Sequence, residues 1–234
     1  MKCCEMLENI KKEYGIVKIL SDKNRCRIFQ LRHKGSGRDI VLREYSTPVA
    51  VYNFLKNIRH NNIPEVYDTY MLEDGQIVLE EFINGITVAE VLESGRYTYR
   101  GAKKIIGSVC DALSFLHSIH VVHRDIKPEN IIIAESGSVK LIDLNASRIF
   151  KSEKDTDTVI LGTVGYASPE QFGLSQSDSR ADIYALGILL NVMLTGVHPS
   201  EQLAKGRAGK IILKCTQIDP NKRYKTVEEL KYSL

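Results

Sequence analysis

The sequence predicts an α+β fold with two lobes, a small, mostly β first lobe and a larger, helical second lobe. Short strand-like runs separated by turns occupy residues 16–82, whereas helical apolar patterns dominate from residue 105 onward. The chain has 234 residues, 43% hydrophobic and 26% charged, which suits one or two packed domains. The lobes should meet near residues 82–87, and no internal repeat or low-complexity linker interrupts the chain.

The first lobe should begin with a short charged helix or a frayed end over residues 1–13 and continue as five strands. The strands are expected at residues 16–20, 25–32, 39–45, 66–71 and 76–82. Between the third and fourth strands, Thr47 can cap a helix that has Pro48 at its first position. This short helix should run only to about Arg59.

The second lobe should contain two long helices and a hairpin. The first helix shows the 3.6-residue period of a half-buried helix, carried by Ile105, Ile106, Val109, Ala112, Leu113 and Leu116. Residues 131–133 and 139–142 should form a hairpin that places Asp143 at a strand end. Residues 183–194 are apolar on nearly every face and end before Gly196, which predicts a fully buried helix.

A run of charged and polar residues lies between the first long helix and the hairpin. Residues 123–130 read His-Arg-Asp-Ile-Lys-Pro-Glu-Asn, and Asp143 follows 18 residues after Asp125. Phosphoryl transfer from ATP needs a group that orients the acceptor hydroxyl and oxygen ligands for magnesium. Asp125 can accept the hydroxyl proton, and Lys127 can neutralise charge on the moving phosphoryl group. Asn130 and Asp143 can bind the metal.

With these motifs, the sequence resembles the eukaryotic-like (Hanks-type) serine/threonine protein kinases, particularly bacterial members, from about Tyr14 to Leu234. Residues 162–170 resemble the end of the family's activation segment, and residues 182–187 resemble the start of its central buried helix. Residues 219–223 match the segment whose arginine, here Arg223, pairs with the glutamate of the activation segment, here Glu170. Small-molecule kinases usually lack this last pair, so the sequence resembles them less than it resembles protein kinases.

The resemblance implies a single protein kinase domain over residues 1–234, with an N-lobe at about 14–82, a hinge at about 82–87 and a C-lobe at about 88–234. The implied activity is phosphorylation of Ser or Thr of a protein substrate by Mg-ATP. Thr163 supports this acceptor class, because serine/threonine kinases place a hydroxyl there that bonds to the catalytic Asp and Lys. The implied adenine contacts are the backbone of Glu81 and Ile83 and the apolar side chains of Ile28, Val41 and Ile132.

The parts that should hold the ATP phosphates depart from the family pattern. The three glycine positions of the phosphate-covering loop hold Ser21, Lys23 and Cys26. Arg43 replaces the lysine that contacts the phosphates, and Val51 replaces the helix glutamate that orients this lysine. These losses leave a second interpretation open, a pseudokinase that acts as a nucleotide-binding or protein-binding scaffold. The intact chemical groups favour the enzyme.

Glu80 offers a replacement for the missing helix glutamate. It takes the position that gates the pocket behind adenine, where an unpaired carboxylate would be costly. We therefore expect an ion pair between Arg43 and Glu80, and the alternative is that Glu80 and Glu81 lie at a solvated cleft edge. In the metal-binding triplet Asp143-Leu144-Asn145, Leu144 keeps an apolar residue and Asn145 replaces the family's glycine.

Arg124 takes the position that receives a phosphorylated activation loop in the family. Thr156 and Thr158 are the candidate phosphosites, and the alternative is a solvated loop without a phosphosite. The net charge of +3 is too small to imply nucleic acid, and no window approaches the roughly 18 apolar residues that span a bilayer. Five cysteines without a repeated spacing read as reduced thiols of a cytoplasmic chain. The oligomeric state stays open.

Overall fold

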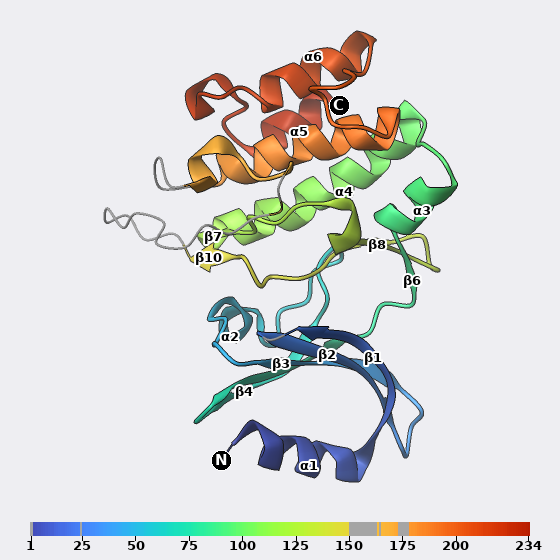
Figure 1. The fold of residues 1–234 in the computed structure, drawn as a ribbon, viewed down its shortest axis with the longest axis vertical. Helices are drawn as coiled ribbons and strands as arrows, with labels where there is room; N and C mark the ends of the chain where they lie inside the picture. Colours follow the sequence, from blue (N-terminus) through green and yellow to red (C-terminus); the bar gives the residue numbers. More distant parts are fainter. Residues whose placement is uncertain (1, 24, 150–162, 164, 173–177) are drawn as a thin grey trace. The chain divides into compact units, whose positions relative to one another are not determined.

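The chain divides into two compact units, Met1–Asn84 and Gly85–Leu234, in a computed structural model that describes residues 2–23, 25–149, 163, 165–172 and 178–234 (Figure 1). The candidate phosphosites Thr156 and Thr158 lie outside these described residues. Within the described ranges, no helix combines the length and the apolar character that crossing a bilayer requires.

The first unit is a five-stranded antiparallel sheet with one helix before its first strand and a second helix between its third and fourth strands. Its elements are α1 (Cys3–Glu13), β1 (Tyr14–Lys23), β2 (Cys26–His33), β3 (Asp39–Tyr45), α2 (Val51–Leu55), β4 (Val66–Leu72) and β5 (Gly75–Glu81). The strand order is β1-β2-β3-β5-β4. All five predicted strands are confirmed, β3 with the expected bounds and β1 longer at both ends.

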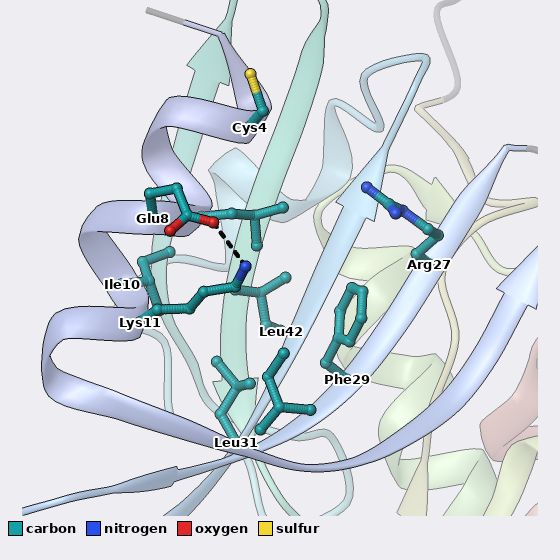
Figure 2. Close-up of a pocket in the computed structure, with 10 residues that line it drawn as sticks. Cys4, Glu8, Ile10, Lys11, Arg27, Phe29, Leu31 and Leu42 are labelled. Atoms are coloured by element: carbon teal, nitrogen blue, oxygen red, sulfur yellow. Dashed lines mark hydrogen bonds and ion pairs between the residues drawn. The ribbon is translucent and has the colours of Figure 1, made fainter.

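The two faces of this sheet carry different side chains, because successive residues of a strand point to opposite faces. One face packs against α1, where Ile10 joins a buried apolar cluster with Leu31 and Leu42. Figure 2 shows this arrangement, with the helix beside the strands that carry these residues. The opposite face of β3 carries Tyr45, whose hydroxyl donates to the hydroxyl of Tyr52 in α2 at 3.0 Å. Residues 41 and 43 therefore face away from α1.

The helix predicted from Thr47 to about Arg59 is wrong at both ends, because α2 covers only Val51–Leu55. Its N-cap residue, Ala50, has no side-chain oxygen to satisfy the first N–H groups. The backbone N–H of Val49 donates instead to the side-chain oxygen of Gln76 in β5, at 2.8 Å. At the other end Asn57 is left-handed, with a φ of 64°, which a right-handed helix cannot continue through.

The second unit is mostly helical and carries two small sheets. Its strands are β6 (Gly85–Thr87), β7 (Val121–Val122), β8 (Ile131–Ala134), β9 (Val139–Leu141) and β10 (Arg148–Ile149). Its helices are α3 (Val88–Ser94), α4 (Tyr99–Ser118), α5 (Arg180–Thr195), α6 (Gly206–Cys215) and α7 (Val227–Ser233). Single 3₁₀ turns cover Pro128–Asn130, Pro169–Phe172 and Pro220–Lys222.

The two long helices and the hairpin predicted for this unit are confirmed. The apolar stripe of α4 is buried, and α5 is buried along nearly its whole length. Gly196 ends α5 in the left-handed region with a φ of 82°, as expected of a glycine cap. β9 ends at Leu141, one residue earlier than predicted, so Ile142 separates the strand from Asp143. The segment that contains Asp125 therefore lies between α4 and the β8–β9 hairpin.

Candidate active site

A buried carboxylate at the start of α5 holds the loop that contains Asp125. Asp182 accepts hydrogen bonds from the backbone N–H of His123 at 3.0 Å and from that of Arg124 at 2.8 Å. Its Oδ2 lies 2.8 Å from His117 Nε2. Burial raises the pKa of the Asp182 carboxyl, but the bond to His117 and the charges and amide around it outweigh burial, so this pKa lies below its ordinary value. Asp182 therefore stays ionised and fixes the loop backbone.

Arg124 itself has a strained backbone, with a φ of 69° in the left-handed region. Its carbonyl accepts a hydrogen bond from Gln171 Nε2 at 3.0 Å, which ties the loop to the 3₁₀ turn over residues 169–172. Strained backbone of this kind persists only where surrounding bonds fix it, and it concentrates at functional sites. The segment that would carry a phosphate toward Arg124 lies outside the described residues.

Asp125, Lys127 and Thr163 form a closed set of short polar contacts. Thr163 Oγ1 donates to Asp125 Oδ1 at 2.6 Å, and Lys127 Nζ donates to Thr163 Oγ1 at 2.8 Å. Lys127 Nζ also lies 2.8 Å from Asp125 Oδ2. Burial raises the pKa of the Asp125 carboxyl, but the hydrogen bonds from Lys127 and Thr163 outweigh it, so this pKa lies below its ordinary value. The site therefore presents an ionised carboxylate that already accepts a hydroxyl hydrogen bond.

Asn130 and Asp143 are brought together by the start and the end of the β8–β9 hairpin. The backbone N–H of Ile142 donates to the carbonyl of Asn130 at 2.9 Å, and Asp143 is the next residue. The side-chain nitrogen of Asn130 donates to the carbonyl of Asp125 at 2.8 Å and to Asp125 Oδ2 at 3.0 Å. The side-chain oxygen of Asn130 is therefore the atom left to face a ligand.

These two residues fit a magnesium ion. Mg²⁺ prefers oxygen ligands and is usually held by one or two protein side chains together with substrate phosphates and water. An amide oxygen from Asn130 and a carboxylate from Asp143 form such a donor set. Asp143 has a φ of 67°, and one of its carboxylate oxygens accepts from the backbone N–H of Asn145 at 3.2 Å.

In the triplet Asp143-Leu144-Asn145, the left-handed backbone does not fall on the residue that replaces the family's glycine. Leu144 is buried, which confirms an apolar residue packed inside the unit. The left-handed residue of the triplet is Asp143, whereas Asn145 is not among the residues with positive φ. The conformational freedom of the family's glycine is therefore not required at Asn145 in this conformation.

In the first unit, Ile28, Val41, Arg43 and Glu80 lie on one face of the sheet. Ile28 stands opposite Arg43 in the β2–β3 pair, and Val41 stands opposite Glu80 in the β3–β5 pair. Residues directly opposite in antiparallel strands place their side chains on the same face. Glu81 and Ile83 follow at the end of β5, whereas Ile132 belongs to the second unit, in β8.

The predicted ion pair between Arg43 and Glu80 is confirmed. Arg43 Nε donates to Glu80 Oε1 at 2.6 Å, and the two side chains are 5% and 6% exposed. Arg43 stands opposite Val78, so Glu80 is its diagonal neighbour on the same face, within reach of long side chains. The alternative of a solvated cleft edge is wrong for Glu80. Val51, at the position of the helix glutamate, is buried at the start of α2.

The residues at the three glycine positions are strand residues. Ser21 and Lys23 lie in β1, and Cys26 begins β2 opposite Lys23, so only two residues separate the strands. Lys23 and Arg25 are exposed, as expected of solvated residues. A connection this short replaces the longer glycine loop that the resemblance implies.

The pair between Arg223 and Glu170 is also confirmed. Arg223 Nη1 and Nη2 donate to the two carboxylate oxygens of Glu170 at 2.6 and 2.9 Å, in a buried bidentate contact. Arg223 Nε donates to the carbonyl of Gln217 at 2.8 Å. Two further residues of the site, His117 and Gln171, could not be identified from the sequence; they hold Asp182 and the carbonyl of Arg124. Neither residue lies in a recognisable motif, although Gln171 directly follows Glu170.

Comparisons with known proteins agree with this geometry. A family model described as the protein kinase domain matches residues 13–233. An Aurora kinase from Candida glabrata is 29% identical over 231 residues, which cover 94% of this chain and 64% of the relative. The serine/threonine-protein kinase PrkC from Bacillus subtilis is 32% identical over 200 residues, 75% of this chain and 31% of the relative. PknB from Mycolicibacterium smegmatis is 30% identical over 208 residues, 76% of this chain and 33% of the relative.

The chain thus spans between about a third and two thirds of the length of these relatives. The family model extends from the end of α1 to the last turn of α7, so it includes both units. The bonded set around Asp125 and the Arg223–Glu170 pair both lie inside the matched range. The chain belongs to the protein kinase family.

Proposed function

We propose that the chain is a serine/threonine protein kinase that transfers the γ-phosphoryl group of Mg-ATP to a hydroxyl of a protein substrate. The observation that carries this proposal is the closed contact set of Asp125, Lys127 and Thr163. It is supported by relatives whose names describe serine/threonine-protein kinases. Thr163 bonds to both the carboxylate and the lysine, which favours Ser or Thr over Tyr as the acceptor.

The chemistry assigned to these residues follows from their charges. The acceptor hydroxyl would donate to the ionised Asp125 carboxylate, which orients its oxygen toward the γ-phosphorus. As the new P–O bond forms and the bond to ADP breaks, the hydroxyl proton passes to Asp125. Lys127 would balance the negative charge on the transferring oxygens. Magnesium held by Asn130 and Asp143 would neutralise charge on the phosphates when bound.

The nucleotide would be held more weakly than in a kinase with the usual lysine and glycines. We assign adenine to the backbone of Glu81 and Ile83 and to the apolar side chains of Ile28, Val41 and Ile132. Arg43, oriented by Glu80, would contact the phosphates as a planar donor in place of the lysine ammonium. The short β1–β2 connection offers no glycine backbone for close approach to phosphate.

Transfer of labelled phosphate from ATP to protein tests the proposal. Asp125→Asn keeps the size of the side chain but removes the proton acceptor, so labelling should fall by about 10²- to 10⁴-fold. Glu201→Gln removes a carboxylate from an exposed position of the same unit and should leave the rate unchanged. Equal labelling by wild type and Asp125→Asn would refute the assignment. Binding of Mg-ATP without any transfer by the wild type would favour the scaffold.

A further inference from the structure

A groove between α4 and α7 carries an excess of positive charge. This basic groove has a volume of about 480 Å³ and is lined by Arg100, Lys103, Lys104, Gly107, Ser108, Asp111, Lys231 and Leu234. Its floor is formed by small residues of α4, because Gly107 and Ser108 lie one turn after Lys103 and Lys104. A methyl group built on Gly107 would lie 3.8 Å from Lys231 Cε, so the Lys231 chain crosses this floor.

The acidic side chain that lines the basic groove is already ion-paired. Asp111 is the lone carboxylate side chain among the lining residues, and it lies 2.5 Å from Lys231 Nζ. Arg100, Lys103 and Lys104 are exposed, and no described carboxylate lies within ion-pair distance of them. Three cations of one groove are thus left without a partner in the described part of the chain.

Helix stability does not account for these cations. They stand among the first six residues of α4, where the helix dipole is positive, and the first turn holds no acidic residue. Positive side chains are disfavoured at that end of a helix. The apolar residues of α4 point the other way, into the core, so Arg100, Lys103 and Lys104 do not pack there. Their charge is available to a partner.

We propose that the basic groove binds an acidic, Asp- and Glu-rich segment of the protein substrate. The distance along α4 from Arg100 to Asp111 is about 16 Å, which matches about five residues of extended chain. Such a segment would meet three unpaired cations and would leave the Asp111–Lys231 pair in place. A role of the basic groove in substrate choice rests on the proposed kinase function. Binding of an acidic segment to the basic groove does not.

Fluorescence anisotropy of a labelled ten-residue peptide of alternating Asp and Glu tests the binding directly. It is measured on the Asp125→Asn background, so that no catalysis is needed. The variant R100Q/K103Q/K104Q should weaken binding by roughly 3- to 100-fold, since three exposed ion pairs are lost. The matched control K205Q/K222Q/K225Q removes the same charge from exposed lysines outside the groove and should bind as the parent does.

Two further arms make the result decisive. Raising NaCl from 50 to 500 mM should weaken binding to the parent but hardly affect the groove variant, because salt screens exposed charges. A peptide of Asn and Gln with the same length should not bind. Equal weakening in the groove variant and the control, equal binding of the neutral peptide, or exclusive binding to phosphatidylserine vesicles would overturn the proposal. Binding of the acidic peptide, together with no phosphoryl transfer by the wild type, would refute the kinase function and still support binding of acidic segments by the basic groove.

Discussion

Replacing either partner of the Arg43–Glu80 pair with methionine should destabilise the protein, and replacing both should cost less than the two single changes added together. Each single change leaves one charged group almost without water, because the two side chains are only 5% and 6% exposed. Breaking a buried pair in this way typically costs about 3–5 kcal/mol. In the double variant no charge stays behind, and methionine fills irregular space well. The coupling should therefore reach about 0.5–3 kcal/mol.

The measurement is a double-mutant cycle from denaturant unfolding, followed by circular dichroism. For a chain of this size each 1 kcal/mol moves the melting temperature by about 2–4 °C, so a single change should lower it by roughly 6–20 °C. Arg27 and Glu44 supply the matched control. Their ion pair is also 2.6 Å long and also joins paired strands, but Arg27 is 47% exposed. Its cycle should give no more than about 1 kcal/mol.

A coupling near zero for Arg43 and Glu80 would refute the reasoning. It would mean that water or another group compensates each charge when its partner is removed. The variant Arg43→Lys, with Glu80 unchanged, distinguishes the effect of the positive charge from the effect of the guanidinium shape. Lysine retains the charge but loses the Nε donor, so part of the stability should return relative to Arg43→Met. ATP affinity measured on the same variants reports whether the orientation of Arg43 matters for phosphates.

Three further outcomes follow from the site. Mg-ATP at about 100 times its dissociation constant should add roughly 2.7 kcal/mol of stability, a melting shift on the order of 5–10 °C, and no shift at millimolar concentration would favour a scaffold that does not bind nucleotide. Incubation with Mg-ATP should place phosphate on Thr156 or Thr158 by mass spectrometry, and labelling that persists in Asp125→Asn would indicate a contaminating kinase. Asp182→Asn should destabilise the protein at neutral pH, because the folded-state pKa of Asp182 is depressed and its stabilisation is present above the ordinary value of 3.8. Denaturation series should show this difference shrinking as the pH falls below 3.8, and a difference that does not depend on pH would exclude the charge as the cause.

The chemical part of the site could be predicted from the sequence because its residues are close together in the chain. Asp125, Lys127 and Asn130 lie in one loop, and the hairpin that returns Asp143 to them is short and strongly patterned. The Arg43–Glu80 pair could also be predicted. The resemblance assigns Arg43 to the phosphate-contacting position and Glu80 to the gate of the pocket behind adenine, and the cost of an unpaired buried carboxylate requires a partner for Glu80.

Features set by distant contacts could not be predicted. The late start of α2 depends on Gln76, which stands 27 residues after Val49 and takes up its backbone N–H. The helix start predicted from Thr47 and Pro48 is wrong, because a local capping preference is weak and tertiary contacts such as this hydrogen bond can outweigh it. The basic groove also depends on contacts between residues that are far apart in the chain. Its cations are ordinary surface residues in the sequence, and only the packing of α7 against α4 makes them line one concave surface.

The position of the Arg43–Glu80 pair bears on how a kinase of this kind could be regulated. In the pattern that the family resemblance implies, the phosphate-contacting residue is oriented by a glutamate on a helix, so movement of that helix can break the pair. Here both partners lie in β3 and β5, which are joined by a continuous ladder of backbone hydrogen bonds. The α2 helix begins with buried Val51 and supplies no acid. Movement of α2 therefore cannot release Arg43 without disrupting the sheet. Control of activity would then act on the second unit, where the hydroxyl of Thr163 donates a hydrogen bond to Asp125.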